Sequence, residues 1–84
     1  MNSKQRKILA DIFSSPTRKN LVWADIESLL LAIGCEIVEG DGSRVAFLRD
    51  GQKADFHRPH PGKEALPYQV RNARNFLRKI GVEP

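Results

Sequence analysis

The residues best suited to chemistry lie within residues 44–63, where both histidines of the chain, His57 and His60, occur among several cations. The imidazole of histidine exchanges protons near neutral pH. The guanidinium of arginine binds phosphate oxygens and never titrates. Chemistry at a phosphate ester needs both abilities, because protons move at its oxygens while negative charge builds up on the phosphate. The segment therefore indicates a phosphate-handling site.

An Asp50-Gly51 pair joins two runs in which apolar and polar residues alternate. Asp-Gly is a strong signal for a two-residue type I′ hairpin turn, because both central residues of that turn take positive φ. We therefore expect two antiparallel strands, over 44–49 and 53–58. A turn of fixed length also fixes which residues of the two strands lie opposite one another.

This register gathers the chemical residues on one face of the hairpin. Counting outward from the turn sets Arg44 opposite His57, with Asp55 two residues away on the same face. The other face is apolar and predicts a core contact; it consists of Val45, Phe47, Ala54 and Phe56. We expect His57 to transfer protons and Arg44 to bind the scissile phosphate. Asp55 would orient the imidazole, and His60 would be a second acid or a substrate contact.

Plainer interpretations stay open beside this one. His57 is also explained as a surface strand residue paired with Asp55, and His60, flanked by two prolines, as a residue that shapes the turn. We expect no metal and no cofactor, since positions 57 and 60 fall on opposite faces of a strand and no third ligand is evident. Ser43 has no evident base and is not expected to be a nucleophile.

The rest of the sequence predicts three helices and one more strand. Apolar residues at helical spacing indicate helices over 3–13, 23–33 and 67–80, and alternation indicates a strand over 35–39. Because the hairpin has one apolar face, the helices must cover that face. We therefore expect an α+β two-layer sandwich with a three-stranded antiparallel sheet, helices on one face, and an extra N-terminal helix. The other sheet face stays open.

The positive charge of the chain is unevenly distributed. Acidic and basic residues balance over 1–40, so the net charge of +4 comes from 41–84. Such a bias fits a polyanionic partner such as RNA. The residues expected to contact RNA are Ser43, Arg44, Lys53, Arg58, Lys63, Arg71 and Arg74. The arginines of the last helix are equally explained as a solvated helix face.

The sequence also bears on the cellular compartment. No run of about 18 apolar residues exists, so no membrane span is expected. The basic N-terminal residues are not followed by an apolar signal core. Cys35 is the only cysteine, so no internal disulfide can form. We therefore expect a cytoplasmic protein.

From residue 26 to residue 82 the pattern resembles the HicA family, the toxins of HicA–HicB toxin–antitoxin pairs. The features that carry the resemblance are a Leu-rich helix ending at Gly34, a Gly42-Ser43 pair entering the second strand, a His-Pro-Gly-Lys-Glu exit at 60–64, and the helix end at 77–82. The resemblance implies an α-β-β-β-α fold like that of double-stranded-RNA-binding domains. It also implies ribonuclease activity on messenger RNA and neutralisation by a HicB-type antitoxin.

Two departures from the family accompany the resemblance. The first 20 or so residues exceed the minimal family length, so we expect a single globular domain that consists of an N-terminal helical extension, 1–20, and a HicA-like part, 21–84. The family typically carries the histidine credited with catalysis directly after Gly-Ser, where this sequence has Arg44. The matching site positions are Gly42, Ser43, His60, Gly62 and Lys63.

Together these observations predict the toxin of a toxin–antitoxin pair, acting as a metal-independent endoribonuclease on messenger RNA. Two alternatives stay open. The domain is either an RNA-binding module that has lost the usual catalytic histidine, or a protein-interaction domain whose open sheet face, with Ala46 and Leu48, docks a partner. RNA fragments produced in vitro would favour the enzyme over both alternatives.

Overall fold

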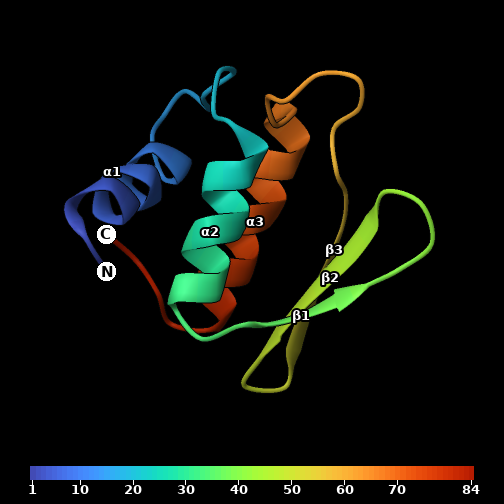
Figure 1. The fold of residues 1–84 in the computed structure, drawn as a ribbon. Coiled ribbons are helices and arrows are strands. Elements are labelled where there is room, and N and C mark those ends of the chain that lie inside the picture. Colours follow the sequence, from blue (N-terminus) through green and yellow to red (C-terminus); the bar gives the residue numbers. More distant parts are fainter.

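Three helices and a three-stranded antiparallel sheet form the fold of residues 1–84, all described by the computed structural model (Figure 1). The helices and strands in chain order are α1 (Ser3–Ile12), α2 (Trp23–Ala32), β1 (Glu36–Glu39), β2 (Arg44–Arg49), β3 (Gln52–His57) and α3 (Pro67–Lys79). This confirms the predicted α+β class and the predicted order of elements. None of the three helices is both long and apolar enough to cross a membrane.

The register of β2 and β3 is the one that the Asp-Gly turn predicts. Arg44 pairs with His57 at the open end of the hairpin, and Arg49 pairs with Gln52 next to the turn. Asp50 and Gly51 have φ values of 53° and 75°, as a type I′ turn requires. β1 pairs with the other edge of β2, which makes β2 the central strand.

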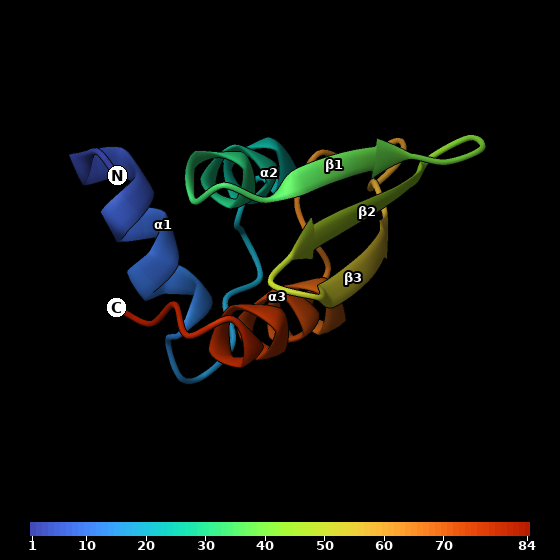
Figure 2. The same cartoon turned by 90° about the horizontal axis from the view of Figure 1, so that it is seen from below.

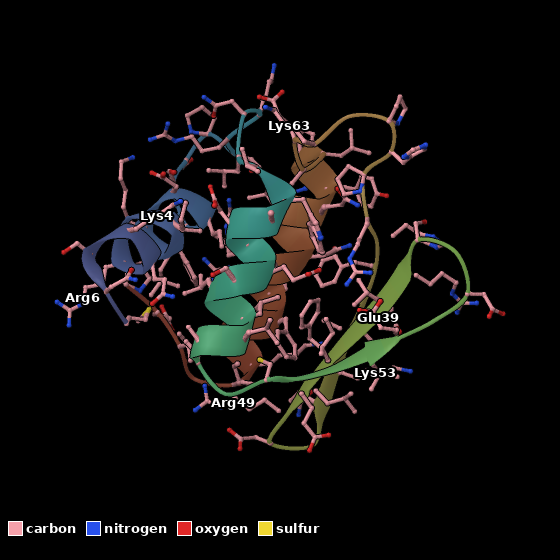
Figure 3. The ribbon with its side chains drawn as sticks, viewed as in Figure 1. Lys4, Arg6, Glu39, Arg49, Lys53 and Lys63 are labelled. Carbon is pink, nitrogen blue, oxygen red and sulfur yellow. The ribbon has the colours of Figure 1, made fainter.

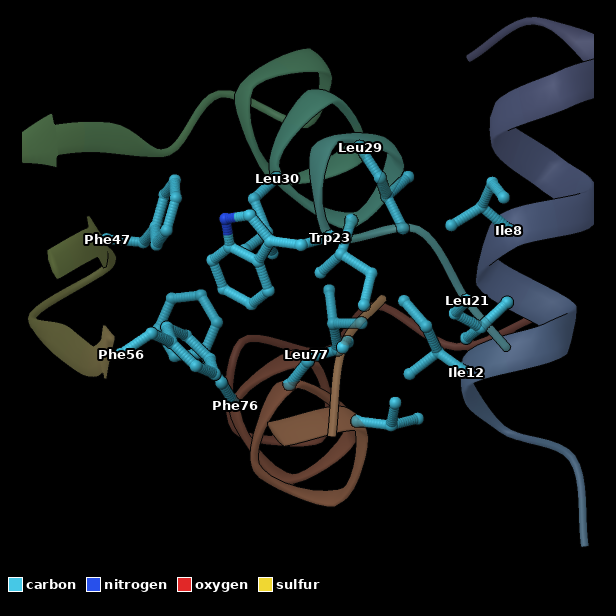
Figure 4. Packing of buried hydrophobic residues seen from close by; sticks show 14 of the residues in the cluster. Ile8, Ile12, Leu21, Trp23, Leu29, Leu30, Phe47, Phe56, Phe76 and Leu77 are labelled. Atoms are coloured by element: carbon cyan, nitrogen blue, oxygen red, sulfur yellow. The ribbon is translucent and has the colours of Figure 1, made fainter. Parts of the chain in front are cut away.

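Aromatic side chains fill the space between the sheet and the helices α2 and α3 (Figure 4). The ring of Phe56 lies 5.0 Å from the ring of Trp23 and 6.1 Å from that of Phe47, measured between centroids. All three rings belong to a single cluster of 18 buried apolar residues. Burial of each such side chain contributes about 1.5–3 kcal/mol relative to leaving it exposed. The helices therefore cover the sheet face that the alternation predicted.

The N-terminal helix forms a further layer behind the other two helices. Figure 2 shows α1 against α2 and α3, on the side away from the sheet. Its apolar residues Ile8, Leu9 and Ile12 are buried in the same cluster as the sheet residues. The guanidinium of Arg74 in α3 donates to the carbonyl oxygens of Ile12, at 2.8 Å, and Ser14, at 3.2 Å. The extension thus shares one core with the rest of the chain.

Backbone hydrogen bonds hold the segment that follows β3 at both ends. The N–H of Arg58 donates to the carbonyl of Ser43 at 2.8 Å, which extends the β2–β3 ladder by one pair. At its other end, the N–H of Ala65 donates to the carbonyl of Leu21 at 2.7 Å. The intervening loop, residues 59–64, therefore starts and ends at fixed points beside the open end of the hairpin.

Candidate functional site

The sheet face away from the helices carries a hollow of about 380 Å³. Its floor is a row of three residues that face one another across the strands, Val38, Ala46 and Asp55. Two cationic residues, Arg44 of β2 and Lys53 of β3, line it as well. Figure 3 shows Lys53 on the side of the sheet opposite the helices. The predicted open face therefore exists, and it is concave.

Arg44 and His57 are direct cross-strand neighbours, and both side chains are exposed. Since the next pair outward, Ser43 and Arg58, is joined by a backbone hydrogen bond, Arg44 and His57 form a pair without such a bond. The side chains of such pairs lie closer together than those of hydrogen-bonded pairs. The predicted neighbourhood of guanidinium and imidazole is confirmed, and both residues line the hollow.

The imidazole of His57 contacts a hydroxyl group. Its Nδ1 lies 3.5 Å from the Oγ of Ser43. Asp55, the residue expected to orient the ring, instead has its Oδ1 3.5 Å from the Nζ of Lys53. The sequence reasoning treated Ser43 only as an RNA contact because it stopped at the strand ends. Strand alternation assigns Ser43 to the face opposite His57, so the register alone does not predict this contact.

A second hollow, of about 510 Å³, lies beside the first at the open end of the hairpin. It is lined by Gly42, Ser43, Arg58, Pro59 and His60. Ser43 thus touches the ring of His57 and also shares a surface with His60. The structure places both histidines at the open end of the hairpin, His57 in contact with Ser43 and His60 in the hollow that Ser43 also lines.

Arg58 was expected to contact RNA, but all three nitrogens of its guanidinium donate to carboxylates within the protein. Its Nη1 and Nη2 donate to the two carboxylate oxygens of Glu39, at 2.6 and 3.0 Å, and its Nε donates to Glu27 at 3.0 Å. Hydrogen bonding to Arg58 holds the pKa of the Glu39 carboxyl below its ordinary value. The same bonds raise the pKa of Arg58 still further above its ordinary value. Arg58 therefore ties the exit loop to β1 and α2.

The remaining cations predicted to contact RNA do not line the open-face hollow. Arg74 is half-buried and bonds to the segment after α1, including the hydroxyl of Thr17 at 3.3 Å. Lys63 and Arg71 are exposed, in the exit loop and on α3. Arg44 and Lys53 are thus the two predicted cations that the structure brings together with His57.

No group of three or more His, Cys, Asp or Glu side chains is placed to hold a metal ion. The one cysteine, Cys35, is a free thiol buried at the start of the sheet. Burial raises the pKa of this thiol, which favours the unreactive protonated form at neutral pH. The chemical groups available on the open face are therefore imidazole, guanidinium, ammonium, hydroxyl and carboxylate.

The fold and this face define a small α+β domain with a concave sheet surface that carries two cations, two carboxylates and an imidazole. Residues 23–82 match a family model described as the HicA toxin of bacterial toxin-antitoxin. Because the match covers most of the chain, the protein belongs to the HicA toxin family, as the sequence resemblance indicated. It is thus the toxin of a toxin–antitoxin system, which implies an antitoxin partner. No curated protein and no solved structure matches the chain significantly.

The match begins at the first residue of α2 and runs past the end of α3. The helix α1 therefore lies outside the matched residues, although it shares the core with them. All residues of both hollows fall inside the match. The candidate site belongs to the part of the chain that defines the family.

Proposed function

We propose that this toxin is an endoribonuclease that cleaves messenger RNA on the open sheet face without a metal ion. The observation that carries the proposal is the cross-strand pair of Arg44 and His57, with the hydroxyl of Ser43 3.5 Å from the imidazole. Its place of action is the cytoplasm. A HicB-type antitoxin neutralises it by covering the same face.

The proposed chemistry begins with His57. When Nδ1 of His57 carries the ring proton and donates a hydrogen bond to the Oγ of Ser43, the lone pair of Nε2 is free to act as a base. Nε2 then removes the proton of a ribose 2′-hydroxyl, and the resulting oxygen attacks the adjacent phosphorus. A 2′,3′-cyclic phosphate forms as the bond from phosphorus to the 5′-oxygen breaks.

Two further groups complete the step. The guanidinium of Arg44 binds the non-bridging phosphate oxygens, whose negative charge grows as the 2′-oxygen attacks. Lys53 lines the same hollow, and its ammonium group, 3.5 Å from a carboxylate oxygen of Asp55, adds a second positive charge there. His60 lies beside Ser43 in the adjoining hollow; as an imidazolium it protonates the departing 5′-oxygen. Base, acid and charge stabiliser then come from one end of the hairpin.

The test is cleavage of a defined messenger RNA by the purified protein, with and without EDTA. We expect fragments ending in 2′,3′-cyclic phosphate, in equal amount with the chelator. His57→Ala should slow cleavage by about 10²–10⁴, the usual contribution of a general base. Full activity in both His57→Ala and His60→Ala, or loss of activity with EDTA, would contradict the proposed mechanism.

A second candidate is a domain that binds RNA without cutting it. It is favoured by Arg44, which occupies the position after Gly-Ser where the HicA family typically carries the histidine credited with catalysis. Binding would then depend steeply on salt, with a slope of about −0.7 for each phosphate neutralised on a single strand. RNA that stays intact while bound at saturating protein would establish this candidate over the enzyme.

A further inference from the structure

We propose a second RNA subsite, in the groove between the outer edge of β3 and the helix α3. An RNA strand bound on the open face would pass over β3 and continue along this groove. This inference rests on the proposed RNA binding and extends it to residues outside the candidate catalytic site. Its ligand is the phosphate backbone and one base of single-stranded RNA.

The groove encloses about 340 Å³ and adjoins the open-face hollow. It is lined by Lys53, Ala54 and Asp55 of β3 and by Asn72, Asn75, Phe76 and Lys79 of α3. Lys53 and Asp55 line the open-face hollow as well. The two depressions therefore share a wall, and a chain that occupies one can continue into the other across β3.

The edge of β3 supplies backbone groups to the groove. β3 is the last strand of the sheet, so only its inner edge pairs with β2. The carbonyl of His57 points outward, since it accepts a hydrogen bond of 2.6 Å from the Nε2 of Gln69 in α3. Hydrogen-bonding groups alternate along a strand, so the backbone groups of Lys53 and Asp55 face the same way. Their N–H groups are donors of the kind that phosphate oxygens accept.

A stripe of exposed polar and aromatic residues on α3 forms the opposite side. Asn72, Asn75 and Lys79 are spaced three and four residues apart, so they share one helix face with Tyr68, four residues before Asn72. Half of the surface of Tyr68 is exposed, 49%. An exposed aromatic ring one helical turn from Asn72 is a stacking platform for a base at the end of the groove. The stripe thus offers both kinds of contact that a single strand needs.

RNA fits this groove better than a protein strand. An open strand edge also accepts an extended peptide, which adds to the sheet through its backbone. Here, however, the groove has two lysines against one aspartate, which pairs with Lys53, and its helix side carries the amides of Asn72 and Asn75 beside Lys79 and Phe76. Cations, donors and a stacking surface match a nucleic-acid strand, and the groove continues into the face where RNA is proposed to be cut.

The test compares labelled single-stranded RNAs of four and twelve nucleotides by fluorescence anisotropy, in a His57→Ala background in which cleavage is slow. Only the longer RNA spans both depressions, so we expect it to bind more tightly. Adding Asn72→Asp and Asn75→Asp places two carboxylates in the groove. We expect the Kd of the four-nucleotide RNA divided by that of the twelve-nucleotide RNA to fall about tenfold, because the longer RNA loses the affinity that it gains in the groove.

Two controls separate the groove from general charge effects. Lys19→Gln with Asn20→Asp changes the net charge by the same amount at exposed positions before α2; the ratio should stay unchanged. Tyr68→Ala should weaken binding of the longer RNA about five- to tenfold, whereas Tyr68→Phe should retain it, because stacking needs only the ring.

If Asn72→Asp with Asn75→Asp leaves the Kd of the twelve-nucleotide RNA unchanged, the subsite is refuted. The open edge of β3 would then be a site for an extended peptide. An equal loss for both RNA lengths would refute the subsite as well. These results do not depend on cleavage, which is measured separately with the natural chain. A toxin that cuts RNA but shows no length effect refutes the groove alone, and one that binds RNA with the length effect but never cuts it refutes the nuclease alone.

Discussion

The two faces of the β2–β3 hairpin are built from alternate residues of the same two strands, yet they differ in every property. On the inner face Val45, Phe47 and Phe56 are buried under α2 and α3. On the outer face Arg44 and His57 are exposed beside a hollow. The packed inner face fixes the register, and the register in turn positions the outer side chains. On the outer face Arg44 therefore stays free for a ligand, while Lys53 pairs with Asp55.

The arginines show the same contrast. Arg58 donates hydrogen bonds to Glu27 and Glu39, and Arg74 donates to backbone carbonyls. Both arginines thereby join separate segments of the fold. Arg44 forms no salt bridge and lines the open-face hollow. Position relative to the core, and not residue type, separates a structural arginine from one that is available to phosphate.

The largest expected difference is between truncations on the two faces. Phe47→Ala empties a site with no solvent exposure, and should lower the free energy of unfolding by about 3–5 kcal/mol. Arg44→Ala removes an exposed side chain, and should change it by less than about 0.5 kcal/mol. Urea unfolding followed by circular dichroism measures both. Similar losses for the two variants would show that the outer face also carries the fold.

The next effect concerns the clamp between α3 and the N-terminal segment. Arg74→Ala leaves the carbonyls of Ile12 and Ser14 without their charged donor. We expect a loss of about 1.5–3 kcal/mol in the free energy of unfolding, the usual range for hydrogen bonds to charged groups. Arg71→Ala, on the exposed side of the same helix, is the matched control. A loss no greater than that of the control would mean that α1 is held by its apolar residues alone.

The smallest effect is the pH dependence contributed by Glu39. Arg58 holds the pKa of this carboxyl below its ordinary value of 4.5. The ion pair therefore stabilises the fold above about pH 4.5, and this contribution is lost as the pH falls through the folded-state pKa. Glu39→Gln should be less stable than the natural chain at pH 7, with the gap closing toward pH 3. A gap that is constant over this range would contradict the assignment.

Sequence alone was enough for the hairpin and for the face on which Arg44 and His57 lie. Asp50-Gly51 fixes the turn, and strict alternation fixes the faces; both depend on residues close together in the chain. The contacts that were missed join distant segments. Arg58 reaches Glu27, 31 residues away, and Arg74 reaches Ile12, 62 residues away. No local sequence pattern indicates such contacts, so Arg58 and Arg74 could not be told from a free arginine such as Arg44 by sequence alone.

The contact between Ser43 and His57 falls between these cases. It lies one pair beyond the strands that the alternation predicts, in a loop whose backbone continues the ladder. The expected partner, Asp55, shares the face of His57 but pairs with Lys53 instead. Which of several neighbours on one face touch one another depends on side-chain rotamers, and periodicity does not contain that information.

The central claim is that Arg44 and His57 act together on one phosphate. It is tested most directly by single-turnover cleavage of one RNA by the natural chain, Arg44→Ala, His57→Ala and the double variant. Residues that serve one transition state are strongly non-additive. We therefore expect the double variant to be little slower than His57→Ala alone. Rate losses that multiply across the two variants, or full activity in His57→Ala, would contradict the claim.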